Sequence, residues 1–206
     1  MIGRRVLERP MAAPLAGFVE RVEHAARLDA VARRLSPLAT RLANGPQAPI
    51  LRGDPLGHAL HPLLTDIPIG CWTSSFLLDL LGGRRSRPAS RTLIGIGLIS
   101  FVPTAAAGLV DWDSVADDPR RRAGVVHAAF NSGAAILYSC SWWQRRRNRH
   151  VRGIAYGLAA GAVASVGGFL GGHLAFADAT GVGERGQPAD PAVLDDEHAL
   201  DGKIGG

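Results

Sequence analysis

Four histidines lie at the ends of long apolar segments, and their side chains are the groups in this sequence best suited to bind a metal or a cofactor. Imidazole in its neutral form binds haem iron, zinc or copper. Ionisable groups carried into an apolar segment that enters a membrane are candidates for function by default. The candidate cofactor-binding and metal-binding residues are His58, His61, His127 and His173.

Three polar side chains near these histidines could orient them. A histidine that binds a metal usually donates its other ring N–H to a carboxylate or a carbonyl group, which fixes the ring. Asp66 and Asp111 could accept such a bond, and Asn131 follows His127 by one helical turn. By spacing, two stripes of side chains are predicted to line the interior of a bundle. They are His127, Asn131 and Tyr138 in one segment, and Asp66, Gly70 and Thr73 in another.

The same histidines have other interpretations. Pro62 suits the first position of a helix, where its missing N–H has no intrahelical bond to lose, so His61 could be the residue that caps this helix. His58 and His173 could lie in the hydrated interface of a membrane without binding anything. A proton relay at a quinol site is a further alternative to metal or haem ligation.

Four apolar segments are long enough to cross a bilayer, which requires about 20 residues of helix. We expect the helices to cover residues 62–82, 91–110, 123–143 and 152–175. Residues 92–110 contain no charged side chain. A helix that is apolar all round is buried or in lipid, which argues against a soluble bundle with polar outer faces. The predicted fold class is all-α, with a four-helix transmembrane bundle.

This topology brings the four histidines to one face of the membrane. His58 and His61 precede the first apolar segment. His127 lies about one turn inside the third segment, and His173 ends the fourth. Inverting the protein moves all four together, so their convergence does not depend on orientation. A bis-histidine haem needs two ligands on facing helices at similar depth, and His127 and His173 meet this requirement best by depth.

Arginine carries almost all of the positive charge in this chain of net charge +5, and the arginines gather between apolar segments. Such clusters are typical of membrane loops, so we expect a lipid bilayer as partner and no nucleic acid. Four arginines lie within residues 84–91 and five within residues 145–152. Positive loops favour the cytoplasmic side. This predicts a multi-pass protein of the inner (cytoplasmic) membrane with both termini extracytoplasmic.

The transmembrane domain is predicted to span residues 56–176, between two polar appendages. Residues 1–55 form an N-terminal arm, in which apolar side chains recur at three- and four-residue steps over residues 15–42. This pattern predicts an amphipathic helix or helix pair, interrupted near Pro37, that lies on the membrane surface or packs on a partner. Residues 177–206 are rich in Gly, Asp and Pro and are predicted to form a flexible polar tail.

Several motifs resemble those of the DUF2231 family of bacterial membrane proteins. The stretch LGHALHPLLTDIPIG at residues 56–70, followed by Trp72, is similar to the family signature, in which GHPLHP precedes an apolar run with a proline and a glycine. Further blocks of the family are similar to GLVDW (residues 108–112), the segment from His127 to Asn131, and GGHL (residues 171–174). The resemblance covers about residues 27–183.

The resemblance implies a four-span helical membrane domain, which in some relatives is fused or adjacent to a Rieske-type iron–sulfur domain. It implies no assigned activity. Two positions depart from the family pattern: Ala59 replaces the usual proline between the first two histidines, and residues 175–178 replace a more aromatic and basic stretch. The first departure loosens the turn that holds His58. The chain has no Rieske ligand set, so an iron–sulfur partner would be a separate chain.

Two functions from different classes are consistent with these residues. The first is a redox-linked electron-transfer subunit, which holds haem b or a transition metal at an outer-face histidine cluster and exchanges electrons with a quinone or a Rieske-type protein. The second is a cofactor-free membrane scaffold, in which the histidines cap helices and the arm recruits a partner. No nucleophile motif of a hydrolase is present, no catalytic residue is assigned, and the question of enzymatic activity stays open.

Overall fold

The computed structural model describes residues 13–184 of the chain, with side chains over residues 14–175. All regular structure in this range is helical, which confirms the predicted all-α class. The described residues form seven α-helices and three short 3-10 turns. The α-helices are α1 (Ala13–Glu23), α2 (Asp29–Ala43), α3 (Ala48–Arg52), α4 (Leu60–Leu81), α5 (Arg87–Asp113), α6 (Asp118–Arg146) and α7 (His150–Glu184).

The chain divides into two compact units, which are described separately. The first extends to Gly171 and the second begins at Gly172. α7 continues to Glu184, beyond the boundary at residue 176 predicted for the transmembrane domain. The rest of the predicted tail lies outside the described residues.

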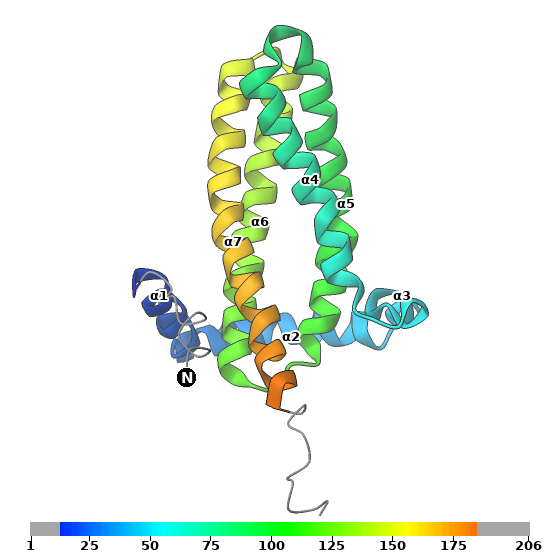
Figure 1. Cartoon of the computed structure of the whole chain (residues 1–206). Coiled ribbons are helices and arrows are strands. Elements are labelled where there is room, and N and C mark those ends of the chain that lie inside the picture. The colour runs from blue at the N-terminus through cyan, green and yellow to red at the C-terminus, as the bar shows by residue number, and fades with distance from the viewer. Residues whose placement is uncertain (1–12, 185–206) are drawn as a thin grey trace, which may run out of the picture. The chain divides into compact units, whose positions relative to one another are not determined.

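Within the first unit, the long helices α4, α5, α6 and the first part of α7 lie side by side (Figure 1). Short connections join α4 to α5 and α6 to α7, so each pair forms an antiparallel helical hairpin. Two helical segments, Gly83–Asp113 and His150–Ala175, are long and apolar enough to cross a bilayer. The helices therefore occupy the four predicted segments, and two of them meet the length and hydropathy expected of a membrane span.

The two hairpins bury equivalent positions. Each buried residue of α4 has a buried counterpart 66 residues later in α6; the pairs are Pro68 and Ala134, Trp72 and Tyr138, and Ser75 and Ser141. An offset of 63 relates four of the seven buried residues of α5 to buried residues of α7; the pairs are Ser90 and Gly153, Gly97 and Ala160, Thr104 and Gly167, and Ala107 and Leu170. From these matched positions we infer that the first unit contains two copies of one hairpin arrangement, and we call the approximate axis that relates them the pseudo-twofold axis.

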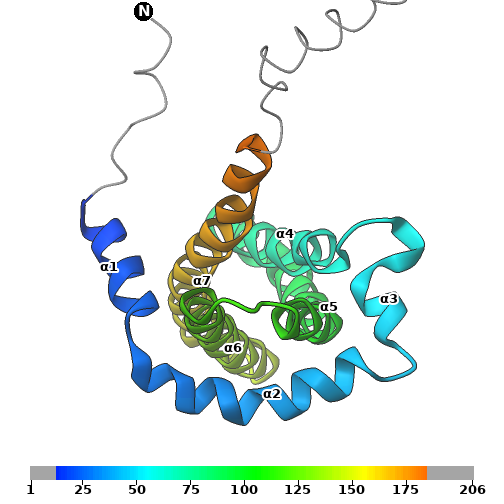
Figure 2. The ribbon, with the colours of Figure 1, turned by 90° about the horizontal axis from the view of Figure 1, so that it is seen from below.

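The N-terminal arm, α1 to α3, curves around one end of the long helices (Figure 2). The apolar face of α2 packs on the ends of α5 and α6, where Ala32 and Ala39 form a buried cluster with Trp112 and Val125. The amphipathic pattern therefore reports packing within the chain itself, rather than on a partner. Other apolar side chains of α2, including Val31, stay exposed.

The predicted break near Pro37 is wrong, because α2 continues through this residue. Pro37 lies on the exposed side of α2, where water can satisfy the carbonyl group that a proline leaves without its helical partner. The break falls earlier, at His24 and Ala25, before a 3-10 turn at Ala26–Leu28. Residues 15–42 of the arm thus form a helix pair, α1 and α2, with its corner one turn before α2.

An ion pair fastens the start of α2 to α6. Arg122 Nε and Nη2 donate to the two carboxylate oxygens of Asp29 over 2.6 and 3.0 Å. The hydrogen bond from Arg122 holds the pKa of Asp29 below its ordinary value. A second link joins the other end of α2 to α5, where Thr40 Oγ1 donates to Asp113 over 2.9 Å.

Candidate functional site

His61 is held against α5 near the arm end of the helices. Its Nδ1 lies 2.9 Å from the carbonyl oxygen of Thr104. Because a carbonyl oxygen only accepts, Nδ1 carries the proton and donates it, which leaves Nε2 with a free lone pair. The ring also lies directly over Gly108, where a Cβ would come within 2.8 Å of the His61 Cε1 atom.

The predicted capping role of His61 is not what the structure shows. α4 begins at Leu60, with Ala59 as its N-cap residue, so His61 lies inside the first turn. Its ring bonds to the neighbouring helix instead of to its own. Pro62 occupies the third helical position, which also has no intrahelical N–H bond to lose.

His127 is held against α7 in the same way. Its Nδ1 lies 2.8 Å from the carbonyl oxygen of Gly167, so Nδ1 again donates and Nε2 keeps its lone pair. A Cβ at Gly171 would come within 2.8 Å of the His127 Cε1 atom. The glycine and the carbonyl that hold His127 are the counterparts, at an offset of 63, of those that hold His61.

The structure brings His61 and His127 together. Their ring centroids are 6.3 Å apart and their planes meet at 85°. The two histidines are themselves counterparts, at the offset of 66 that relates α4 to α6. This histidine pair (His61 and His127) therefore lies across the pseudo-twofold axis, with each ring fixed through Nδ1 and free at Nε2.

Asn131 and Asp111, two of the predicted orienting residues, lie near the histidine pair. Asn131 Nδ2 donates to the carbonyl oxygen of His127 over 2.9 Å and lies 3.3 Å from both nitrogens of the His127 ring. An atom equally distant from both ring nitrogens is not in line with the lone pair of either, so Nε2 of His127 stays available. Asp111 interacts electrostatically with His61.

The other predicted site residues are placed differently. His58 is exposed before α4, and its Nδ1 lies 3.3 Å from the carbonyl oxygen of Ala59. His173 is half-buried on α7 and belongs to the second unit. Over the described part of the chain, no group of three or more His, Cys, Asp or Glu side chains is arranged to hold a metal ion. The four-histidine metal centre is therefore unsupported, and the pair is what the geometry offers.

The predicted interior stripe of α4 is wrong. Asp66, Gly70 and Thr73 are all exposed. The stripe that faces inward contains Pro68 and Trp72. The prediction for α6 was better, since His127 and Asn131 are half-buried and Tyr138 is buried.

A buried ion pair that the sequence analysis missed lies at the far end of the same helices. Arg145 of α6 is only 1% exposed, and its Nη1 and Nη2 donate to the two carboxylate oxygens of Asp79 on α4 over 2.8 and 2.5 Å. Ser90 of α5 donates to Asp79 over 2.8 Å, and Ser141 accepts from Arg145 Nε over 3.1 Å. Asp79 and Arg145 are also counterparts at an offset of 66.

Between the two ends, Trp72 stacks on Tyr138, with ring centroids 4.2 Å apart and planes at 17°. These aromatic residues each follow a histidine of the pair by 11 positions. A cavity of about 120 Å³ lies between this stack and the Asp79–Arg145 pair. Three layers of counterparts therefore follow one another along the axis: histidines, aromatics and an ion pair.

A signal for these layers is present in the sequence, but it is weak. Arg145 resembles a loop arginine in the sequence, because three further arginines follow it within four residues. A search at an offset of 66 would have aligned the histidines and the serines of α4 and α6, together with Trp72 and Tyr138. Few other positions of the two hairpins are identical.

Comparison with known families identifies one that covers most of the chain. The family model described as "Predicted membrane protein (DUF2231)" matches residues 57–184, a region that contains both hairpins and all three layers. The chain belongs to this family of predicted membrane proteins. No curated protein and no solved structure matches it.

Proposed function

We propose that this protein is a four-helix integral membrane protein whose histidine pair binds haem b or a transition metal and serves electron transfer. The observation that carries the proposal is the matched geometry of His61 and His127. Each ring donates its Nδ1 proton to a backbone carbonyl group and keeps its Nε2 lone pair. This is the state that a metal-binding histidine adopts, with the second nitrogen orienting the ring.

The spacing of the layers supports a membrane-spanning placement of all four helices. Eighteen residues of α4 separate His61 from Asp79, which corresponds to about 27 Å of helix. The hydrocarbon core of a bilayer is about 30 Å thick. The histidine pair and the ion pair then lie close to opposite surfaces of that core, and the apolar helix between them crosses it.

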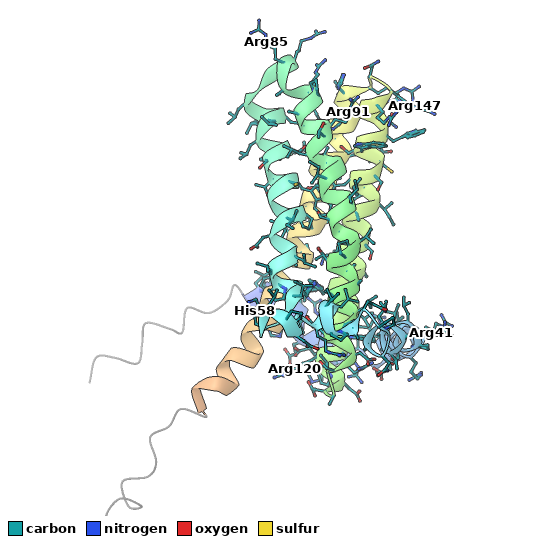
Figure 3. All side chains as sticks on the ribbon, turned by 90° about the vertical axis from the view of Figure 1, so that its right-hand side faces the viewer. Arg41, His58, Arg85, Arg91, Arg120 and Arg147 are labelled. Carbon is teal, nitrogen blue, oxygen red and sulfur yellow. The ribbon has the colours of Figure 1, made fainter. Side chains whose placement is uncertain are left out.

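Arginines flank this span at both ends. Figure 3 shows Arg85, Arg91 and Arg147 at the end far from the arm, and Arg41 and Arg120 at the arm end. The far end has loops rich in arginine, which supports the cytoplasmic side for this end, with the arm outside the inner membrane. Val31 and Leu38 of α2 are exposed apolar side chains beside arginines. They support an arm that lies in the lipid interface.

A redox site near one surface of the membrane requires an electron partner that reaches that surface. We propose a quinone within the lipid or a separate Rieske-type protein outside it. Asp111 and Asn131 would tune the histidines from close range. Asn131 holds the backbone of His127, and Asp111 places a carboxyl group within electrostatic range of His61.

The first test is an optical spectrum of the full chain in mild detergent, before and after dithionite, with metal analysis of the same sample. A Soret band that sharpens on reduction, or a stoichiometric transition metal, would support the proposal. A folded protein with neither colour nor metal, purified under conditions that retain haem, would contradict it. That result would favour the cofactor-free scaffold, for which the exposed Val31 and Leu38 offer a surface.

A further inference from the structure

We infer that His61 and His127 are the two axial ligands of a single b-type haem, whose iron lies on the pseudo-twofold axis between α4 and α6. This inference rests on the proposed function and narrows it. It replaces the pair predicted by depth, His127 and His173, and it selects haem over a metal ion without a porphyrin.

The number of donors favours haem. A structural zinc site uses four protein ligands, and a catalytic zinc site uses three. The described residues place only two imidazoles together and hold no group of three or more potential ligands. Haem iron needs only axial ligands from the protein, because the porphyrin supplies four equatorial nitrogens, and histidine is a common axial ligand. Two imidazoles are therefore a full protein ligand set for haem and an incomplete one for zinc.

The separation of the rings matches two ligands on opposite sides of one iron. A metal–imidazole bond is about 2.0–2.1 Å long and a ring nitrogen lies about 1.1 Å from its ring centre, so two opposed imidazoles have centroids about 6.2–6.4 Å apart. The observed separation is 6.3 Å. Edge-to-face ring pairs span about 4.5–7 Å, so the number of donors and the Nδ1 hydrogen bonds, together with this separation, select haem.

The surroundings of the rings explain why they stay apart. Each ring lies over a glycine of the next helix, and a Cβ at Gly108 or Gly171 would collide with it. The glycines let the rings lie back against α5 and α7, and the hydrogen bonds from Nδ1 hold them there. Nε2 of each ring is the nitrogen that these hydrogen bonds leave for an iron between the rings, and Asn131 Nδ2 lies 3.3 Å from that of His127.

The pseudo-twofold axis also defines the mutual orientation of the ligands. Each ring takes its orientation from its own hairpin, and the planes meet at 85°. Low-spin ferric haem with nearly perpendicular imidazole planes gives a strongly anisotropic EPR signal, dominated by one low-field feature. Parallel planes give a rhombic signal with three resolved features. The structure therefore predicts a spectroscopic type as well as a ligand pair.

The test uses the full chain in mild detergent, expressed with added haem precursor and also loaded with hemin after purification. The wild-type protein is expected to bind one haem per chain, in a low-spin state with the anisotropic EPR signal. His61→Ala and His127→Ala should each lower low-spin haem content by about tenfold or more, since even supporting residues of a metal site contribute 10–100-fold to affinity. Circular dichroism and size-exclusion chromatography of the apo-proteins check that the fold survives.

His24→Ala is the matched control, because His24 is exposed just after α1 and lies outside the pair. This variant should keep the wild-type spectrum. In His61→Gly, free imidazole should restore the low-spin signal, which a purely structural role for His61 would not allow.

The outcomes separate this inference from the proposed function. Stoichiometric zinc or copper without haem would overturn the inference and leave the metal form of the proposed function standing. Low-spin haem that persists in His61→Ala, or a rhombic signal in the wild-type protein, would overturn this ligand geometry while keeping a haem protein. A folded wild-type chain that binds neither haem nor metal would overturn both.

Discussion

The two ends of the long helices are built from counterpart positions and behave in opposite ways. At one end the counterparts are identical, His61 and His127. At the other end they are complementary, Asp79 and Arg145. An acid and a base neutralise one another, so the far end is complete by itself. Two histidines fixed through Nδ1 each present a lone pair, and neither can donate to the other, so the pair does not complete its own hydrogen bonding.

The two hairpins therefore contain one layer whose polar groups bond to one another, Asp79 and Arg145, which we call the closed layer. They also contain one layer in which each residue keeps an unused ring nitrogen, His61 and His127, which we call the open layer. Around Arg145, hydrogen bonds to Asp79, Ser90 and Ser141 use its guanidinium on every side. Around the histidine pair, the protein satisfies Nδ1 and leaves Nε2. The Asp79–Arg145 end thus links the two hairpins through an ion pair. The histidine end leaves one ring nitrogen of each hairpin available to a ligand.

The largest effect on folding is expected from breaking the closed layer. Asp79→Ala should lower the free energy of unfolding by about 3–5 kcal/mol, because it leaves Arg145 buried without its counter-charge. The measurement is thermal or denaturant unfolding in detergent, followed by circular dichroism. Asp66→Ala is the control, since Asp66 is exposed on the same helix, and its effect should stay within about 0.5 kcal/mol.

A charge-swapped double variant tests whether positions 79 and 145 are equivalent. In the double variant Asp79→Arg with Arg145→Asp, the charges exchange between counterpart positions. Ser75 stands four residues before position 79, as Ser141 stands four residues before Arg145, so the relocated arginine meets a serine. The swap should recover most of the stability that either single change removes. A swap no more stable than the single variants would show that the two positions are not equivalent.

A smaller effect is expected from disturbing the open layer. Gly171→Ala should displace the His127 ring, because the new Cβ would lie 2.8 Å from Cε1. Such overpacking costs about 1–3 kcal/mol, and cofactor content should fall with it. Gly168→Ala on the same helix is the matched control. A Cβ at Gly168 meets nothing within 4 Å, and this change should be neutral or stabilise the helix by up to about 1 kcal/mol. Equal behaviour of the two variants would argue against the glycine cradle.

The smallest effect is expected from a half-buried ion pair at the histidine end. Asp29→Asn should loosen α2 from α6, detected as faster amide hydrogen exchange in the arm, with little change in the stability of the long helices. Asp54→Asn, which alters a more exposed carboxylate beside Arg52, is the control. Unaltered exchange in Asp29→Asn would show that apolar packing alone fastens the arm.

The pH dependence of this contact follows from the pKa of Asp29. Because Arg122 lowers that pKa in the folded state, the contact stabilises the arm at neutral pH, above the ordinary Asp value of about 3.9. The stabilisation is lost as the pH falls through the lowered pKa. Hydrogen exchange of the arm in the wild-type protein should therefore rise only in strong acid, and Asp29→Asn should lack this step.

Much of the architecture was predictable from local sequence patterns. The all-α class, the four long helices near residues 62–82, 91–110, 123–143 and 152–175, and the amphipathic arm all follow from hydropathy and spacing. The family resemblance at residues 56–70 was also predictable and is confirmed. Helix boundaries were less accurate at Leu60, where α4 begins two residues before the predicted segment, and at Pro37, whose exposed position lets α2 continue.

The site was predictable in its residue types but not in its pairing. Histidine chemistry selects His61 and His127 from the sequence, and spacing places Asn131 beside His127. Which face of α4 points inward was not predictable, because that helix is apolar on several sides and carries Asp66 on the exposed one. Arg145 resembles its loop neighbours in sequence, and only its contact with Asp79 distinguishes it.

The sequence by itself determined that the chain forms long apolar helices with histidines at one end, because helix length and hydropathy are properties of contiguous residues. The tertiary structure alone decided that His61 faces His127, that Trp72 stacks on Tyr138 and that Asp79 neutralises Arg145. These pairs depend on how two hairpins 66 residues apart pack around a common axis. That packing is the sum of many contacts between distant residues, and no local pattern contains it.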